Sequence, residues 1–437
     1  MRFWAHEVAE MTGGRLHGPD LAIDGTDFDS RSIGPGQLFV PLVAERDGHD
    51  FVGAALERGA AAYLTSRAPM GGTAIEVDDT LRALMRLAQG MRGRFDGPVV
   101  GVTGSVGKTS TKDLARAALA AGRRTWANEK SFNNEQGLPT TVLNAPADSE
   151  VMVLEMGMRG FGEIAALCDI ARPTIGVVTR VAEAHSDRVG GIEGVARAKA
   201  ELVRALPGNG IAVLNADDER VRSMETFAPC TVLTFGESAD ADVCLERVEL
   251  DASARPAFTV RTPWGAVEAR LAMSGRHMAL NAAAALAVAG ASGVDLHAAA
   301  AALGGVGTAS MRMHIERSTS GAIVVDDTYN ANPTSMRAAL DALVDLPARR
   351  RLAVLGLMAE ISDAPVEHQS IAQYASARGV DVIAVGTDLY GVPSVDTPGA
   401  ALDAIAARYG DLGDGDAVLV KGSRVAGLER AAAALRG

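Results

Sequence analysis

One glycine-rich segment constrains the fold of this chain more than any other feature. The sequence TGSVGKTS at 103–110 follows the β-branched run 99–103 and precedes a stretch with helical apolar spacing. A loop between a buried strand and a helix directs backbone N–H groups toward one point, which is typical of phosphate binding. In such a loop Lys108 reaches the β- and γ-phosphates of ATP and the Thr109 hydroxyl ligates Mg²⁺. The loop residues expected to bind ATP are Thr103, Gly104, Ser105, Val106, Gly107, Lys108 and Thr109.

The alternative for this segment is a glycine-rich turn that only packs. Val102 occupies the place of the first glycine in the widespread G-x-x-x-x-G-K-[ST] pattern, and the segment instead fits T-G-[ST]-x-G-K-[ST]. Strand, loop, lysine and helix nevertheless follow one another in the required order. This order favours ATP binding over a packing turn.

Length and composition limit what surrounds the loop. A chain of 437 residues suits two to four domains. A net charge of -12 and 4% aromatic residues disfavour a nucleic-acid partner, and three cysteines without a CxxC spacing disfavour disulfides and structural zinc. No apolar stretch reaches the roughly 20 residues of a membrane span, and the N-terminus is too polar for a signal peptide. We therefore expect a cytoplasmic protein with no membrane span.

The order of apolar runs predicts an α/β protein of three domains. Region 1–79 holds short strand-like runs separated by turn residues, which indicates a small mixed α/β domain. Region 80–311 alternates strands and helices, which predicts a central P-loop ATPase-like parallel sheet, with an antiparallel flank over 230–272. Region 312–437 repeats a strand–helix cycle and predicts a C-terminal Rossmann-like domain. We expect a separate hydrophobic core in each region, and ATP between the second and third.

Individual elements follow from the spacing of apolar residues. Short runs rich in valine, isoleucine and leucine predict buried strands, and longer stretches with apolar residues every three or four positions predict helices. We expect strands at 99–103, 152–154, 175–178, 211–214, 322–325, 352–355, 380–385 and 417–420, and long helices at 79–95, 192–206 and 277–290.

A lysine interrupts the apolar face of the helix expected over 192–206. Ile192, Val195 and Leu202 belong to an apolar stripe at helical spacing, and Lys199 falls within it. A buried ammonium is costly and tends to lose its proton unless it is paired. Lys199 is therefore paired, neutral or chemically modified, unless its stem packs while its amine reaches water. The helical pattern alone favours neither reading.

Three further segments, together with the phosphate loop, resemble the core of the Mur ligase family. They are EMGMRG at 155–160, AEAHSDRVGG at 182–191 and AKAEL at 198–202. The resemblance implies an ATP-dependent, ADP-forming ligase that makes amide bonds through an acyl phosphate. It implies that Glu155 and His185 ligate Mg²⁺, that two Mg²⁺ ions bind, and that CO₂ converts Lys199 into a carbamate that positions the second ion. The implied catalytic residues are Lys108, His185, Lys199 and Arg312.

The resemblance runs nearly end to end and is greatest to the family members that add D-alanyl-D-alanine to a UDP-N-acetylmuramoyl-tripeptide. DSRS at 29–32, PGQLFV at 35–40 and DGHDF at 47–51 resemble the segments around the UDP-sugar. SFNNEQGLP at 131–139 resembles the asparagine-rich substrate loop of these members. The implied substrate residues are Ser30, Arg31, Asn133 and Asn134.

The nucleotide contacts outside the loop also follow from the resemblance. GRHMALN at 275–281 resembles the adenine-contact segment and implies a role for Asn281. VDDTYNANP at 325–333 implies that Asp327 contacts the ribose, and Arg312 fits the arginine expected at the γ-phosphate. VKGSR at 420–424 closes the match.

The chain departs from the family pattern at several positions. Arg180 stands where asparagine is usual, Met278 replaces an asparagine, Met311 a glycine and Leu357 an aspartate. The alternatives are therefore a Mur-type ligase for another acid and amine, such as folate with glutamate, or a catalytically inactive nucleotide-binding homologue. The asparagine-rich loop disfavours folate, and the retained Lys108 disfavours inactivity. Lysine and diaminopimelate are both compatible at the third peptide position, and we expect a monomer.

Overall fold

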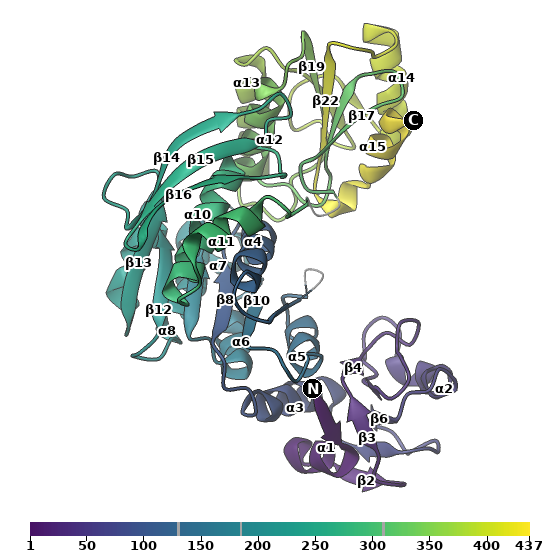
Figure 1. The fold of residues 1–437 in the computed structure, drawn as a ribbon. Coiled ribbons are helices and arrows are strands. Elements are labelled where there is room, and N and C mark those ends of the chain that lie inside the picture. Colours follow the sequence, from purple (N-terminus) through teal and green to yellow (C-terminus); the bar gives the residue numbers. More distant parts are fainter. Residues whose placement is uncertain (129–131, 184–185, 308–310) are drawn as a thin grey trace.

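The computed structural model consists of three α/β parts arranged in a row (Figure 1). The structure describes residues 1–128, 132–183, 186–307 and 311–437. Within these residues the parts are built around sheets of five, nine and six strands, in chain order. The predicted mixed α/β class with parallel sheets is confirmed.

The N-terminal part combines a small mixed sheet with short helices. Its sheet has the order β2-β7-β6-β5-β4, in which β2 and β7 are antiparallel and the other pairs are parallel. A separate ribbon pairs β1 with β3. The elements are β1 Arg2–Trp4, α1 Ala5–Thr12, β2 Arg15–His17, β3 Ala22–Asp24, β4 Thr26–Asp27, β5 Leu38–Phe39, a 3-10 turn Gly48–Phe51, α2 Val52–Glu57, β6 Ala62–Thr65 and β7 Ala74–Glu76.

The central sheet has the order β16-β15-β14-β13-β12-β11-β8-β10-β9. Its pairs from β9 to β14 are parallel, whereas β14, β15 and β16 form the antiparallel flank that the sequence predicts. The strands are β8 Val99–Thr103, β9 Thr125–Ala127, β10 Val151–Glu155, β11 Ile175–Val178, β12 Ile211–Asn215, β13 Thr231–Gly236, β14 Val243–Leu250, β15 Pro256–Thr262 and β16 Gly265–Arg270. Because parallel strands end at one edge, the segments after β8, β10 and β11 meet there.

Helices cover both faces of the central sheet. On one face α4 packs against α10 and α11, and on the other α6 contacts both α3 and α8. Side chains of β8 alternate accordingly, with Val100 and Val102 in the first layer and Val99 in the second. The helices are α3 Thr80–Arg92, α4 Lys108–Ala120, α5 Gly137–Leu143, α6 Glu163–Ala171, α7 Ser186–Val189, α8 Ile192–Arg204, α9 Glu219–Arg222, α10 His277–Ala291 and α11 Leu296–Leu303.

The C-terminal part is a six-stranded sheet of order β17-β18-β22-β19-β20-β21, parallel except for β17. Strand β18 runs to Asp327 and β22 to Lys421, and the register places these two residues side by side. The elements are β17 His314–Arg317, β18 Ile323–Asp327, α12 Pro333–Asp345, β19 Arg350–Leu355, α13 Ala364–Ser376, β20 Asp381–Val385, β21 Ser394–Val395, α14 Pro398–Tyr409, β22 Asp416–Lys421 and α15 Glu429–Arg436.

The apolar clusters are partly confined to single regions and partly shared between regions. The N-terminal and C-terminal parts each have a small cluster of their own. The two largest clusters cross the expected boundaries, since one joins Phe3 to Met152 and the other joins Val100 to Leu419. Each terminal region therefore has a small core of its own and shares a larger one with the central region, and the division into three domains stays a prediction. Small sheets bury too little apolar surface alone, and here they share it with the central part.

Arg92 fastens α3 to the central part, which gives a testable prediction for stability. This buried guanidinium donates to the carbonyls of Ala171 at 2.6 Å, Phe95 at 2.5 Å and Arg172 at 3.2 Å. We expect Arg92→Met to lower the free energy of unfolding by about 2–3 kcal/mol, because these carbonyls lose their donor inside the protein. Urea unfolding measures the change. Arg82→Met on the exposed side of α3 is the control, and an equal loss there would contradict the assignment.

Candidate functional site

A cavity of about 1080 Å³ lies where the central and C-terminal parts meet. The phosphate loop, the segments after β10 and β11, the start of α10 and residues of the C-terminal part line it. The charged lining residues are Lys108, Arg159, Arg180, Arg188, Lys199, Arg312, Lys421 and Arg424, with Glu135, Glu155, Glu163, Asp327 and Glu360. Cations exceed acids here although the chain carries a net charge of -12, so the cavity suits an anionic ligand.

The phosphate loop has the conformation that its glycines allow. Gly104 has φ 150°, and a Cβ there would lie 1.8 Å from the Thr179 Oγ1. Gly107 precedes α4 with φ 82°, and a Cβ there would lie 2.7 Å from Asn281 Oδ1. Only glycine fits such close approach at positive φ. The amides of the first turn of α4 are left without intrahelical acceptors, which provides an anion-binding end.

The Lys108 side chain folds back from the start of α4 into the phosphate loop. Its Nζ donates to the Gly104 carbonyl at 2.7 Å. Burial lowers the pKa of Lys108, and Arg312 lowers it further while Glu155 raises it. A phosphate group entering the cavity would restore the preference for the charged amine, because an opposite charge favours the ammonium.

Glu155 ends β10 beneath the loop and is almost fully buried. Its Oε2 accepts from the Thr109 hydroxyl at 2.8 Å, and its Oε1 accepts from the Asn133 amide at 2.7 Å. The structure therefore brings together two residues expected at Mg²⁺ and one expected at the substrate. Oxygen donors of this kind are the ligands that Mg²⁺ prefers.

Lys199 points inward from α8, as the apolar stripe predicts. Its side chain is 4% exposed, and it lines the cavity. Among the described residues, none forms an ion pair or hydrogen bond with its Nζ. Burial, with a smaller contribution from Lys108, holds the pKa of Lys199 well below its usual value. The buried position disfavours the reading in which the amine reaches bulk water, and it favours the neutral form of the amine.

His185, the remaining residue of the expected metal site, lies outside the described residues. Within the described part of the chain, no three His, Cys, Asp or Glu side chains are close enough to hold a metal ion. The oxygen ligands Thr109 and Glu155 are the described members of the expected set.

The C-terminal part contributes the other wall of the cavity. The Arg312 guanidinium stacks on the Tyr329 ring at 3.8 Å from its centroid. Asp327 accepts from the Met313 N–H at 3.1 Å and forms an ion pair with the buried Lys421. Lys421 also donates to the Asn330 carbonyl at 2.8 Å. The sequence predicted a ribose contact for Asp327 but no role for Lys421. Lys421 ends an apolar strand, and a lysine in an apolar segment indicates a buried amine, as it does at Lys199.

The adenine-contact segment also reaches the cavity. Asn281 lines the cavity from α10. Its Nδ2 lies 3.6 Å from the Sδ of Met278, so the methionine that replaces the family's asparagine contacts a predicted nucleotide residue. His277, which sequence reasoning did not single out, lines the cavity as well. Burial lowers the pKa of His277 and so favours the neutral ring.

The predicted substrate residues divide into two groups. Asn133 and Asn134 line the cavity, but the Asn134 Oδ1 also accepts from the N–H of Gly137, the first residue of α5, at 2.9 Å. Ser30 and Arg31 are not part of the described lining, and the exposed Arg31 pairs with Asp29 at 2.7 Å. The cavity therefore brings together the asparagines but not the N-terminal pair.

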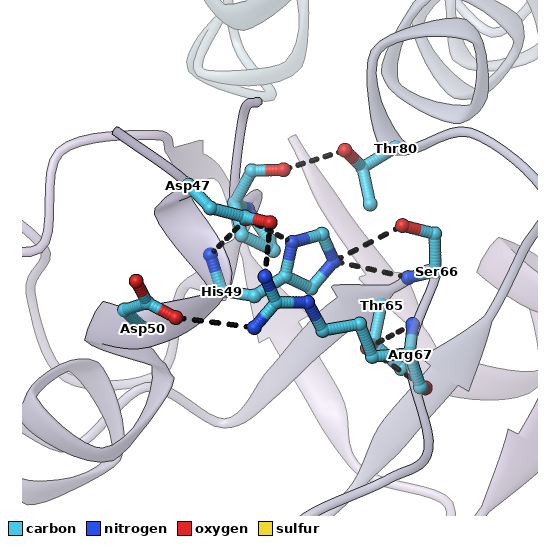
Figure 2. A network of polar contacts seen from close by, with 8 residues as sticks. Asp47, His49, Asp50, Thr65, Ser66, Arg67 and Thr80 are labelled. Atoms are coloured by element: carbon cyan, nitrogen blue, oxygen red, sulfur yellow. Dashed lines mark hydrogen bonds and ion pairs between the residues drawn. The ribbon is translucent and has the colours of Figure 1, made fainter. Parts of the chain in front are cut away.

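The DGHDF segment forms a closed polar network (Figure 2). His49 Nδ1 contacts Asp47 Oδ1 at 2.6 Å, and its Nε2 accepts from the Ser66 backbone N–H at 3.0 Å. Arg67 pairs with Asp47 and with Asp50. The aspartate–histidine–serine order is that of a hydrolase triad, but the backbone N–H occupies the nitrogen that would act as base. The network therefore fastens the segment to the end of β6.

The other departures lie around the cavity. Met311, which stands where the family has glycine, adopts φ 61°, a region that favours glycine. Its Sδ lies 2.8 Å from Arg424 Nη1. The Leu357 carbonyl accepts from the Ser423 N–H at 2.9 Å, so this contact needs only the backbone. Arg180 lines the cavity, and its carbonyl accepts from the Ser105 N–H at 2.7 Å.

Among the described residues, none of the helices is both long and apolar enough to cross a membrane.

Comparisons with known proteins agree with this geometry. Residues 102–289 match the Mur ligase middle domain, and residues 311–424 match the Mur ligase glutamate ligase domain. The UDP-N-acetylmuramoyl-tripeptide–D-alanyl-D-alanine ligase of Mycobacterium bovis is 38% identical, over 98% of this chain and 96% of that protein.

Solved structures extend the likeness to the whole fold. The UDP-N-acetylmuramoylalanyl-D-glutamyl-2,6-diaminopimelate–D-alanyl-D-alanyl ligase of Acinetobacter baumannii has a TM-score of 0.87 at 29% identity, covering 100% of this chain and 98% of that one. The MurF ligase of Thermotoga maritima in complex with ADP has a TM-score of 0.83 at 28% identity, covering 94% and 97%. With the domain matches, this likeness shows that the chain belongs to the Mur ligase family.

Proposed function

We propose that this protein joins D-alanyl-D-alanine to a UDP-N-acetylmuramoyl-tripeptide and cleaves ATP to ADP and phosphate. The observation that carries the proposal is the convergence of Lys108, Thr109, Glu155 and Lys199 with Arg312 on one cavity. Relatives with this named activity cover 98% of the chain. The reaction belongs to peptidoglycan precursor synthesis, for which we propose a cytoplasmic location and a monomeric enzyme.

The chemistry needs an activated carboxyl group. The terminal carboxylate of the tripeptide attacks the γ-phosphorus of ATP, the bond to the β-phosphate oxygen breaks, and an acyl phosphate and ADP form. The amine of D-alanyl-D-alanine then attacks the acyl carbon, and phosphate leaves with the bonding pair. Lys108 and Arg312 neutralise charge on the transferring phosphoryl group, and the cavity walls align the reactants.

We propose that Thr109 and Glu155 hold Mg²⁺ together with His185. The Thr109 hydroxyl and the Glu155 carboxylate fit this role because both are oxygen ligands at one buried point. Bound there, Mg²⁺ would offset negative charge on the phosphates. The Asn133 amide keeps the carboxylate oriented.

We also propose that Lys199 reacts with CO₂ to form a carbamate. Carbamylation requires the neutral amine, and burial of Lys199 favours this form because it lowers the pKa of the amine. The nitrogen lone pair attacks the carbon of CO₂, a proton leaves the nitrogen, and the product is an anion. The new carboxylate would suit a second Mg²⁺ next to the phosphate loop.

We retain the division into a substrate domain at 1–79, an ATP-binding domain at 80–311 and a Rossmann-like domain at 312–437 as a proposal. The three main sheets support it, because each region contains one of them. The shared apolar clusters indicate that the three domains depend on one another for stability.

A steady-state assay tests the proposed function. We expect ADP release only when ATP, the UDP-linked tripeptide and D-alanyl-D-alanine are all present, because the acyl phosphate is consumed by the amine. Coupled detection of ADP, with product identified by mass, measures this. Turnover with a folate and glutamate would support the redirected ligase, and binding of ATP without any turnover would support the inactive homologue.

A further inference from the structure

Part of the cavity lining comes from elements that contain none of the predicted nucleotide residues, and we call this part the second arm. The nucleotide end is lined from α10 and the C-terminal part, whereas the second arm is lined from α3, α6, α7 and the segment after β10. These two sets of helices lie on different faces of the central sheet, since α4 packs with α10 and α6 packs with α3 and α8. The lining residues of the second arm are Met85, Met158, Arg159, Ala166, Leu167 and Arg188.

Two arginines of the second arm have no partner within the described residues. Arg159 and Arg188 are both exposed, and no carboxylate in the described part of the chain pairs with either guanidinium. Glu163, four residues after Arg159, instead accepts from the Arg159 backbone N–H at 2.7 Å. In a chain with a net charge of -12, unpaired arginines on a cavity wall are positioned for an anionic ligand.

The peptide acceptor of the proposed reaction has carboxylates that could pair with these two arginines. A tripeptide of the alanyl-glutamyl-diaminopimelate kind, which the name of the Acinetobacter baumannii ligase contains, keeps one free glutamyl carboxylate. Diaminopimelate has two further carboxylates, of which one reacts. Two carboxylates therefore remain as spectators, whereas a lysine at the third position leaves one.

We propose that Arg159 and Arg188 bind the two spectator carboxylates, so that the protein prefers a diaminopimelate-containing acceptor over a lysine-containing one. The inference rests on the proposed function and names its acceptor. A guanidinium can hold a carboxylate through two parallel hydrogen bonds, and its charge persists throughout the usable pH range. The apolar side chains of Met85 and Leu167 line the same cavity and suit the methylene stems of the peptide.

Kinetics of single variants test the assignment. We expect Arg159→Gln and Arg188→Gln each to raise KM for the diaminopimelate acceptor about tenfold, as for loss of one charged hydrogen-bonding partner. KM for ATP and kcat should change less than about twofold, because neither side chain is placed at the nucleotide end. One of the two variants should leave KM for the lysine acceptor nearly unchanged. Arg188→Lys should recover part of the loss, since it keeps the charge but not the paired geometry.

Controls separate this inference from the function on which it rests. Arg430→Gln, an exposed arginine on α15 outside the cavity, should leave every constant unchanged. Calorimetric titration of the acceptor without ATP should show the same loss of affinity in both variants. Unchanged acceptor KM, an equal rise in KM for ATP, or a wild-type preference for lysine would overturn the inference. Absence of turnover by the wild type with either acceptor would instead overturn the proposed function.

Discussion

Lys108→Ala should lower kcat by about 10²–10³-fold, the loss seen when one preorganised electrostatic donor is removed from a buried site. The lysine amine lies inside the phosphate loop, 2.7 Å from the Gly104 carbonyl, and lines the cavity with Arg312. Charge on the transferring phosphoryl group is greatest in the transition state, so the loss should fall on kcat more than on KM. Single-turnover measurement of acyl phosphate formation separates this step from amide formation.

The control for Lys108 lies on the same helix. Arg116→Ala changes an exposed α4 side chain outside the cavity and should leave kcat within about twofold of the wild type, as for ordinary surface substitutions. Both variants should unfold at similar temperatures. Near-normal turnover by Lys108→Ala would show that the phosphate loop has been assigned wrongly.

Local patterns in the sequence predicted the parts of the site that lie on single elements. The loop at 103–110 and the inward Lys199 follow from a strand–loop–helix order and from helical spacing, and both depend on residues close in sequence. The hydrogen bond from the Gly137 N–H to the Asn134 Oδ1 at the start of α5 is also local, since these residues are three positions apart. The resemblance, in contrast, assigned Asn134 to substrate alone.

Other parts of the site depend on pairing between distant segments, which spacing does not encode. Asp327 and Lys421 meet because β18 and β22 are parallel neighbours in a particular register. The apolar clusters cross the expected boundaries for the same reason, since shared packing is a property of the assembled sheets. The first described lining residue in the chain is Met85 in α3, so the lining of the cavity does not include Ser30 or Arg31.

Lys199→Ala should abolish most of the activity, by at least about 10²-fold, because it removes the proposed carbamate that would hold a second Mg²⁺ against the phosphates. Lys199→Arg should lose as much activity, since the arginine guanidinium keeps its positive charge and does not form a carbamate. Glu193→Ala, which breaks an exposed ion pair on the same helix, is the control and should leave kcat nearly unchanged.

The chemistry of the proposed carbamate gives readouts beyond loss of activity. Depletion of CO₂ and bicarbonate should slow the wild type and not the Lys199→Ala variant, and ¹³C-bicarbonate should produce a carbamate carbon signal in the wild type alone. Short carboxylates such as acetate should restore part of the activity of Lys199→Ala by occupying the space that the side chain leaves. Electron density for an unmodified Lys199 in an ion pair with an acidic side chain, with nucleotide and Mg²⁺ bound, would contradict the carbamate. We expect density for the carbamate instead, because the Lys199 amine is buried and has no acidic partner among the described residues.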